Sequence, residues 1–230
     1  MCMTVPLSFL NKKVNILSGT AGSGKSELAL NIAFDIGDFL NINLIDADVI
    51  NYYFNLRNVK DLINKKNIKF ITTHFENAAI DLPIMSGEII NAIQNDETVN
   101  IIDVGGDALG ISVLAQYKEI FEQKGYNLFY VLNVFRPENS TTEKIIENMN
   151  DIESILNLNI NGIINCSHLL DKTTIGDVIS SLEIAQKISE IKNVPYTLTV
   201  INEKLFEQEL IEEIKKYSLV YAIKKYIIRE

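Results

Sequence analysis

Short apolar runs alternate along the chain with segments whose apolar residues recur at helical spacing. The runs are continuous, which is typical of strands buried on both faces of a parallel sheet. They predict strands near Val14–Ser18, Ile42–Asp46, Lys69–Thr72, Val99–Val104, Leu128–Val134, Ile160–Asn165 and Tyr196–Val200. The segments between them predict helices near Ser26–Ile36, Val59–Asn64, Ser86–Asn95, Ile111–Lys124, Thr141–Leu156, Ile175–Ile191 and Glu203–Ile228. We therefore expect an α/β fold, a three-layer sandwich with a mostly parallel central sheet and helices on both faces.

The alternation runs from one end of the chain to the other without a Pro/Gly-rich linker, a charge block or an internal repeat. One domain over residues 1–230 is the expectation. The helix near Thr141 has a clear start signal, because Ser140 to Glu143 has the form of a capping box and Pro137 disfavours helix upstream.

Residues 19–26, here called the phosphate loop, read Gly-Thr-Ala-Gly-Ser-Gly-Lys-Ser and match G-x-x-x-x-G-K-[ST] at every fixed position. Gly19, Gly22 and Gly24 allow turns that a Cβ would forbid, so successive N–H groups can face phosphate oxygens. The loop lies between a predicted strand and the start of a predicted helix, whose dipole favours an anion. The pattern predicts a nucleoside triphosphate site and the fold of P-loop NTPases.

Two side chains of the loop have a specific predicted chemistry. Lys25 can reach the β- and γ-phosphates, and the Ser26 hydroxyl can bind Mg²⁺. The nucleotide-binding set predicted for this segment is Gly19, Thr20, Ala21, Gly22, Ser23, Gly24, Lys25, Ser26 and Glu27.

Aspartates at the ends of two further strands can complete a magnesium site. Asp103 ends an apolar run and precedes Gly105 and Gly106, so we expect it to hold Mg²⁺ through water while the glycines approach the γ-phosphate. Asp46 and Asp48 are two residues apart, so their carboxylates point the same way in an extended chain. They end a strand where ligands bind in open α/β sheets. The alternatives are an Asp that only caps a glycine turn and a solvated acidic turn.

Taken together, the glycine loop, the Asp46-x-Asp48 pair and Asp103-x-x-Gly106 resemble the MinD/ParA-type ATPases of the SIMIBI class. Segments 134–138, 162–165 and 200–203 agree loosely with the same family, so the resemblance runs over most of the chain. It implies that Lys25 and Ser26 contact the phosphates and Mg²⁺, and that Asp46 and Asp103 lie near the metal ion. It also implies that Lys25 is catalytic, that Asp48 orients the hydrolytic water, and that Asn165 contacts the base.

The loop departs from the family at one important position. The family's loop begins with Lys-Gly-Gly, and that lysine reaches the partner's nucleotide across a sandwich dimer. Here Thr20 occupies the place of the lysine. Dimerisation through other contacts, or another cation such as Arg57 or Arg136, stays open, and either arginine is equally a surface residue.

The composition limits the partners. The chain is 47% apolar and 22% charged with a net charge of −9, which fits a globular protein and argues against a nucleic-acid grip. Cys2 and Cys166 form no C-x-x-C pair, and neither His74 nor His168 has metal-ligand spacing, so the histidines are expected at surface or capping positions. No apolar run approaches the ~20 residues of a membrane span, and the basic residues near the start follow the apolar stretch, unlike a secretory signal. We expect a cytoplasmic protein.

MinD proteins end in a membrane-binding amphipathic helix, and the predicted last helix carries an apolar stripe that includes Leu210, Ile211 and Ile214. Packing of this stripe on the sheet is the expectation here, and membrane binding is the alternative.

The function expected from these features is that of a Mg²⁺-dependent ATP-binding protein, a slow ATPase acting as a nucleotide switch. Its partner would be a protein client, such as a metalloenzyme under assembly, or a second copy of the chain. The alternative is a small-molecule or nucleotide kinase, which the single arginine between Lys124 and Leu170 weakens because such kinases usually have an Arg-rich lid. A module that holds ATP structurally, and GTP in place of ATP, also stay open.

Overall fold

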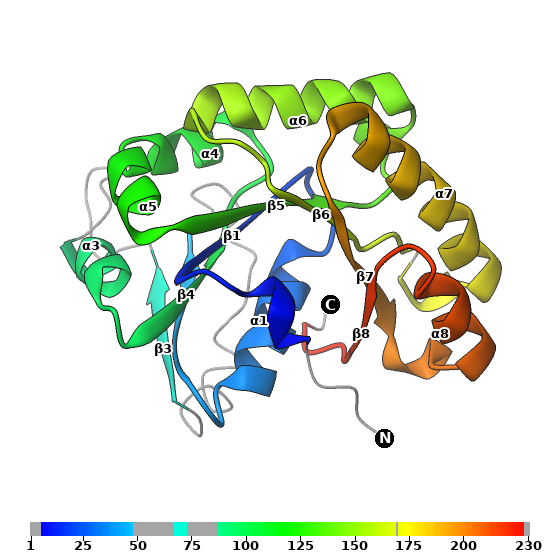
Figure 1. The fold of residues 1–230 in the computed structure, drawn as a ribbon, viewed down its shortest axis with the longest axis horizontal. Helices are drawn as coiled ribbons and strands as arrows, with labels where there is room; N and C mark the ends of the chain where they lie inside the picture. Colours follow the sequence, from blue (N-terminus) through cyan, green and yellow to red (C-terminus); the bar gives the residue numbers. More distant parts are fainter. Residues whose placement is uncertain (1–5, 48–66, 73–86, 169, 228–230) are drawn as a thin grey trace.

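The central element is a sheet of eight parallel strands in the order β3-β2-β4-β1-β5-β6-β7-β8 (Figure 1). The structure is a computed structural model that describes residues 6–47, 67–72, 87–168 and 170–227. The strands are β1 (Val14–Ser18), β2 (Asn41–Asp46), β3 (Ile68–Thr72), β4 (Thr98–Asp103), β5 (Tyr126–Leu132), β6 (Gly162–Asn165), β7 (Tyr196–Asn202) and β8 (Leu219–Ile223). All seven predicted strands are confirmed, and β8 is additional.

Helices cover both faces of the sheet, which confirms the predicted sandwich. The α-helices are α1 (Lys25–Ile36), α3 (Gly87–Gln94), α4 (Ala108–Ala115), α5 (Lys118–Lys124), α6 (Thr142–Leu156), α7 (Ile175–Lys192) and α8 (Gln208–Ile214). The 3-10 helices are η1 (Leu7–Phe9), η3 (Pro137–Asn139), η4 (Leu170–Lys172) and η5 (Glu203–Leu205). Within the described ranges, no helix is both long and apolar enough to cross a membrane.

Figure 1 shows α1 on one face of the sheet and α3 to α8 on the other. The connection from β1 to β2 runs toward the β3 edge, whereas those from β3 to β4 and from β4 onward run toward the β8 edge. Since crossovers between parallel strands are right-handed, opposite directions place the connecting helices on opposite faces. The strand order therefore explains why α1 lies on one face of the sheet and the later helices on the other.

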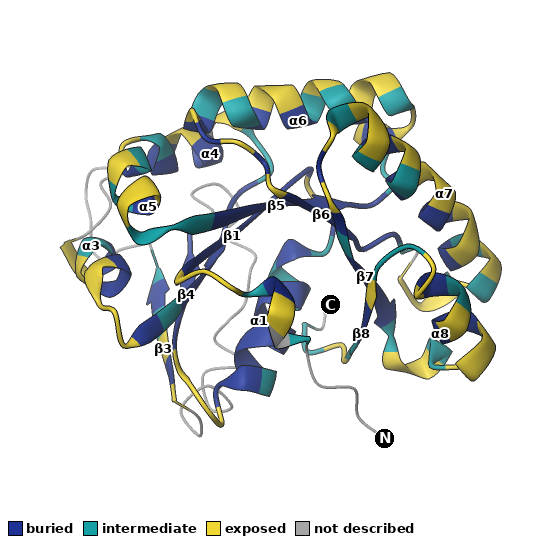
Figure 2. Ribbon diagram, viewed as in Figure 1, coloured by how far each residue is buried: buried dark blue, intermediate teal, exposed yellow. Residues whose placement is uncertain are grey.

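Each face has its own apolar core. The core under α1 includes Leu28 and Ile32 of the helix and Phe9 of η1, packed on strand residues such as Leu17 and Phe129. The other core lies under α3 to α8 and takes its side chains from the opposite face of the same strands. Figure 2 shows the resulting pattern, in which the strands are largely buried, the helices on the α3 to α8 face expose their outer sides, and α1 has no exposed residue.

Two predicted helices are wrong in extent. The segment Ile111–Lys124 is divided into α4 and α5, because a turn bonds the Tyr117 N–H to the Leu114 carbonyl (3.0 Å) and directs Tyr117 into the core. The segment Glu203–Ile228 is not one helix: it forms η5, α8 and β8. The predicted helix Val59–Asn64 lies outside the described residues.

The C-terminal strand explains the second error. β8 pairs in parallel with β7, and its Val220 and Tyr221 are buried. The short run from Leu219 to Ile223 is rich in β-branched and aromatic residues, a composition that suits a strand once a neighbour is available. Leu210, Ile211 and Ile214 of α8 are buried in the core, so the apolar stripe packs on the sheet as expected.

Helix α6 begins one residue later than the predicted capping box. Its N-cap is Thr141, whose hydroxyl accepts the N–H of Lys144 (3.3 Å). A true capping box, formed by Thr174 and Asp177, begins α7 instead.

Four buried asparagines form a row across neighbouring strands near their amino ends. Asn43 of β2 donates to Asn100 of β4 (2.9 Å), Asn15 of β1 lies beside the Asn100 backbone, and Asn127 of β5 donates to Asn15 (2.8 Å). All four side chains are buried. Because a buried amide without a partner is costly, this mutual bonding is what permits polar residues inside the sheet.

Candidate functional site

The phosphate loop connects the buried strand β1 to α1 in a conformation that depends on glycine. Gly19, Gly22 and Gly24 have φ angles of 146°, 71° and 97°. A Cβ on Gly19 would lie 2.5 Å from the Val131 carbonyl oxygen, so glycine is required there for space as well as conformation. The three glycines thus have the role in shaping the loop that the sequence predicted.

The side chain of Lys25 is folded into this loop. Its ammonium donates to the carbonyl oxygens of Gly19 and Thr20, both at 2.9 Å, and the residue is only 7% exposed. These bonds hold the positive charge of Lys25 against the backbone of the phosphate loop, where the sequence predicts that the phosphates bind. A phosphate entering the loop would meet this charge at hydrogen-bond distance from the loop backbone.

Two buried hydroxyls at the loop have no hydrogen-bond partner among the described residues. They belong to Ser18, the last residue of β1, and to Ser23 within the loop, and both residues are 0% exposed. Buried hydroxyls are normally bonded, so two such groups at one loop indicate a site that is completed by a ligand. This polarity distinguishes the loop from an ordinary strand-to-helix turn.

The three predicted metal-binding residues come together beside the loop. Asp46 and Asp103 are paired in the register of β2 and β4, and both are less than a tenth exposed. Ser26, Asp46 and Asp103 line one small cavity of about 10 Å³. A hydroxyl and two carboxylates are the hard oxygen ligands that Mg²⁺ uses together with water and phosphate. These residues fit a magnesium ion that also binds a triphosphate.

The described residues contain no group of three or more His, Cys, Asp or Glu that could hold a metal by itself. Mg²⁺ is usually bound through one or two carboxylates and the substrate phosphates. When bound, the ion would neutralise phosphate charge, and Ser26, Asp46 and Asp103 would hold it or its water shell.

The segment after Asp103 packs directly on the phosphate loop. A Cβ on Gly106 would lie 2.5 Å from the Ala21 nitrogen and 2.9 Å from the Thr20 carbonyl carbon. Since these are backbone atoms that cannot move aside, only glycine fits. The segment that follows β4 is therefore in contact with the part of the loop where the γ-phosphate is expected.

On the opposite side of the loop, the segment after β5 makes two contacts that the sequence did not predict. Asn139 donates to the Thr20 hydroxyl (3.1 Å), and Arg136 Nε donates to the Gly22 carbonyl (2.8 Å). Tyr130 donates to Asn139 in turn (3.1 Å), and burial raises the pKa of Tyr130 so that it stays a donor. Thr20, at the place of the family's lysine, is buried and tied to its own chain.

Asn165 ends β6 and is fully buried. Its amide nitrogen donates to the hydroxyls of Ser181 (2.8 Å) and Tyr196 (3.0 Å), and its carbonyl oxygen accepts both the N–H and the hydroxyl of Ser167. A base contact would require some of these bonds to be exchanged. That role of Asn165 stays a prediction.

Cys166 and His168, which follow Asn165, lie beside the loop instead. A Cβ on Gly24 would be 3.6 Å from Cys166 Cβ and 3.4 Å from His168 Nε2. The Leu170 N–H donates to His168 Nδ1 (3.2 Å), so a neutral ring carries its proton on Nε2, the atom nearest the loop. Burial raises the pKa of the Cys166 thiol, which therefore stays neutral. His168 is a site neighbour that its sequence context did not reveal.

The Glu27 side chain points away from the loop, toward the end of the chain. Its carboxylate accepts the backbone N–H groups of Tyr226 and Ile227. Asn31, one turn further along α1, exchanges two 2.8 Å hydrogen bonds with the Lys224 backbone. A nucleotide contact by Glu27 would therefore come from its backbone, and this also stays a prediction.

Several predicted or candidate residues lie outside the described part of the chain. These are Asp48, which was predicted to orient the hydrolytic water, the candidate cation Arg57, and His74.

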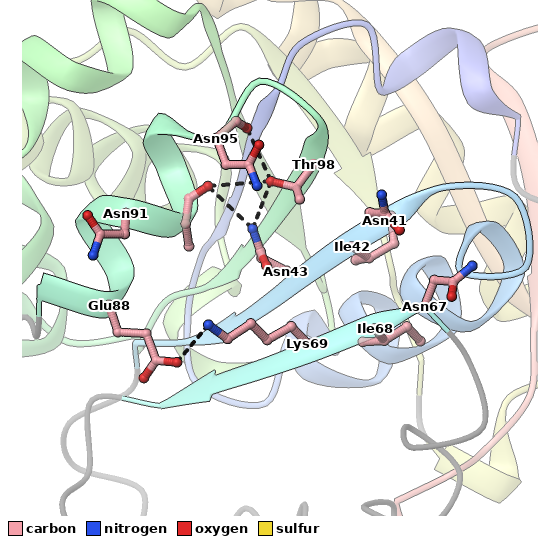
Figure 3. Close-up of a pocket in the computed structure, with 11 residues that line it drawn as sticks. Asn41, Ile42, Asn43, Asn67, Ile68, Lys69, Glu88, Asn91, Asn95 and Thr98 are labelled. Atoms are coloured by element: carbon pink, nitrogen blue, oxygen red, sulfur yellow. Dashed lines mark hydrogen bonds and ion pairs between the residues drawn. The ribbon is translucent and has the colours of Figure 1, made fainter.

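A second hollow, of about 510 Å³, lies at the amino ends of the strands, and we call it the amino-end hollow (Figure 3). Asn43 on its wall donates to Thr98 (2.9 Å), and an ion pair joins Lys69 to Glu88 (2.8 Å). Ligands of open α/β sheets bind at the carboxyl ends of strands. This hollow is at the other end, and four of its lining residues, Asn43 with Thr98 and Lys69 with Glu88, bond to one another in pairs.

No protein-family model matches the chain, and no curated protein is similar to it in sequence. Among solved structures, the fold is similar to FtsY from Mycoplasma mycoides, with a TM-score of 0.52 and 15% identity over 89% of this chain and 68% of that one. It is also similar to the signal recognition particle receptor FtsY from Elizabethkingia anophelis, with a TM-score of 0.53 and 16% identity over 89% of this chain and 66% of that one. At such identity the likeness shows the fold alone, and it confirms the predicted three-layer α/β sandwich.

Proposed function

We propose that this protein binds ATP with Mg²⁺ and hydrolyses it slowly, as a nucleotide switch for a protein client such as a metalloenzyme under assembly. The observation that carries the proposal is the phosphate loop. It combines three glycines of positive φ, a lysine ammonium held at the loop backbone, and two buried serine hydroxyls without a partner among the described residues. These are the requirements for holding a phosphate chain.

The switch part of the proposal is supported by the contact of Gly106 with the loop. A γ-phosphate bound there, with Mg²⁺ at Ser26, would press on the segment that follows Asp103. Loss of that phosphate on hydrolysis would release the segment, as in other P-loop switches. Asp48 would orient the attacking water, and Asn165 would contact the base after exchanging its present bonds.

Membership of the MinD/ParA-type ATPases without the signature lysine is part of the same proposal. Thr20, at that position, is buried and accepts a hydrogen bond from Asn139. A side chain so placed has no charge to offer a second subunit, so hydrolysis would be slow in the isolated protein and would rise when the client reorders the loops.

Isothermal titration with ATP, GTP and ADP in the presence of Mg²⁺ tests the binding, and a product assay with and without small-molecule acceptors follows it. The proposal expects saturable ATP binding at one site, and slow release of inorganic phosphate that acceptors do not change. Transfer of phosphate to an acceptor would identify a kinase instead. Absence of any triphosphate binding would refute the proposal as a whole.

A further inference from the structure

Two hydrogen bonds join the segment after β5 to the phosphate loop. Arg136, which immediately precedes η3, donates to the Gly22 carbonyl (2.8 Å). Asn139, the last residue of η3, donates to the Thr20 hydroxyl (3.1 Å). The loop and this segment are more than a hundred residues apart in sequence. The contact is therefore made by the fold, and it adds a cation to the phosphate loop.

The backbone around Arg136 is fixed before any ligand arrives. The Arg136 N–H donates to the Asn133 carbonyl (3.2 Å), and the Asn139 N–H donates to the Arg136 carbonyl (2.9 Å). The Asn139 side chain donates to the same Asn133 carbonyl (2.9 Å), and Pro137 restricts the chain between them. A cation held in this way loses little freedom when it contacts a ligand.

The guanidinium of Arg136 covers Gly22. A Cβ on Gly22 would lie 2.5 Å from Nη2 and 2.6 Å from Cζ of Arg136. The bond to Gly22 uses only Nε, whereas a guanidinium has five N–H donors in a planar fork. Within the described ranges, the terminal nitrogens have no further hydrogen-bond partner.

We propose that Arg136 is the second cation of the phosphate site, and that its guanidinium binds the phosphate chain of the nucleotide from within the same chain. The inference rests on the proposed function. Arg136 and Lys25 would then both face the phosphates. In the MinD/ParA-type family a lysine at the position of Thr20 reaches the partner's nucleotide, and here Arg136, in the segment after β5, would supply that positive charge from within the same chain. Planar guanidinium groups suit phosphate oxygens because they can donate two parallel bonds.

Two variants separate the charge of Arg136 from its bond to the loop. Arg136→Lys keeps a positive charge, and Arg136→Gln keeps a neutral N–H donor. Lys144→Gln is the matched control, since Lys144 is an exposed cation on the first turn of α6 whose ammonium bonds to Ser140 (3.2 Å). Thermal unfolding without nucleotide shows that each variant is folded.

Titration with ATP, ADP and adenosine then measures the effect. Arg136→Gln should weaken ATP and ADP binding about tenfold or more, the size of a lost hydrogen bond between charged groups. Adenosine binding should not change, because adenosine has no phosphate. Arg136→Lys should retain more affinity than Arg136→Gln, and the control should behave as the wild type.

Equal losses in the lysine and glutamine variants would show that the positive charge of residue 136 does not act on the phosphates, and would overturn the inference. So would wild-type affinity in Arg136→Gln, or a loss that extends to adenosine. In each of these cases the wild type still binds ATP and the proposed function stands. A wild type that binds no triphosphate would overturn both.

Discussion

The two ends of the central sheet both contain buried polar residues, but they use them differently. At the amino ends, each asparagine of the buried row bonds to another asparagine of the row or to nearby backbone, so each of these side chains has a partner. The row consists of Asn43, Asn100, Asn15 and Asn127. At the carboxyl ends, the hydroxyls of Ser18 and Ser23 are buried without a partner in the described chain. The first arrangement stabilises the fold, whereas the second leaves bonding capacity for a ligand.

The two ends also differ in the size of their hollows. The amino-end hollow is far larger than the cavity beside Asp103, about 510 Å³ against about 10 Å³. Yet Asn43 and Thr98, and Lys69 and Glu88, bond to one another on its wall, and it lies at the end of the sheet where ligands are not usually bound. Unsatisfied hydrogen-bonding groups and a fixed cation identify the phosphate loop better than volume does.

Among the variants considered, Lys25→Ala should weaken ATP binding most. It removes the ammonium from the phosphate loop, so ATP affinity should fall about 100-fold, the upper range for hydrogen bonds to charged groups. Circular dichroism should show an intact fold. Lys69→Ala is the control at the amino-end hollow and should bind ATP normally, because Lys69 forms its ion pair with the exposed Glu88 at the other end of the sheet. Retention of ATP affinity within about a factor of two by Lys25→Ala would sink the assignment of the loop.

Asp103→Asn should have the next largest effect, on the rate of hydrolysis and its dependence on Mg²⁺. The loss should be about 10- to 100-fold, as for other residues that orient a metal ion or its ligands. Nucleotide binding should change less, since the phosphate contacts come from the loop. Asp107→Asn is the control four residues later, because asparagine can still cap α4. A rate and Mg²⁺ dependence like those of the wild type would remove Asp103 from the metal site.

Asn100→Ala tests the other end of the sheet. It removes the acceptor of Asn43 and leaves a gap in the asparagine row, so the free energy of unfolding should fall by about 2 kcal/mol. ATP affinity of the folded variant should not change. Urea denaturation measures the first effect and calorimetry the second, with the exposed Asn91→Ala as control. An ATP affinity that falls with Asn100→Ala would mean that the two ends are coupled.

The smallest effect is expected from Glu27→Gln. The amide has one acceptor oxygen in place of two, so one of the bonds to Tyr226 and Ile227 should weaken and stability should fall by about 0.5–1 kcal/mol. Binding of ATP should be unaffected, because this side chain faces the end of the chain. Thermal unfolding with Glu207→Gln as control measures the difference. A clear loss of ATP affinity would instead place the carboxylate itself at the nucleotide.

The sequence predicted those parts of the site that depend on contiguous residues. The glycine loop, Lys25 and Ser26 lie within eight positions of one another, and Asp46 and Asp103 each end an apolar run. A parallel sheet then brings such strand ends to one edge. The strands were predicted for the same reason, since buried parallel strands are continuous apolar runs.

What the sequence could not predict depends on tertiary contacts. Arg136 looked equally suited to the surface, and only the fold places it at Gly22. Asn165 matched a base-contacting pattern, but its four bonds to Ser181, Tyr196 and Ser167 come from elements that meet only in the folded core. The segment that forms β8 was predicted to be helical because a short apolar run is compatible with a helix or a strand. Its pairing with β7, which exists only in the folded chain, makes it a strand.

A crystal structure with Mg²⁺ and a non-hydrolysable ATP analogue would decide whether the phosphate loop holds the nucleotide. We expect the β-phosphate inside the phosphate loop, bonded to backbone N–H groups and to Lys25. Mg²⁺ should lie at the Ser26 hydroxyl with Asp103 beside its water shell, and the asparagine row should be unchanged. An analogue bound elsewhere, for example in the amino-end hollow, or a metal ion remote from Ser26 and Asp103, would contradict the account.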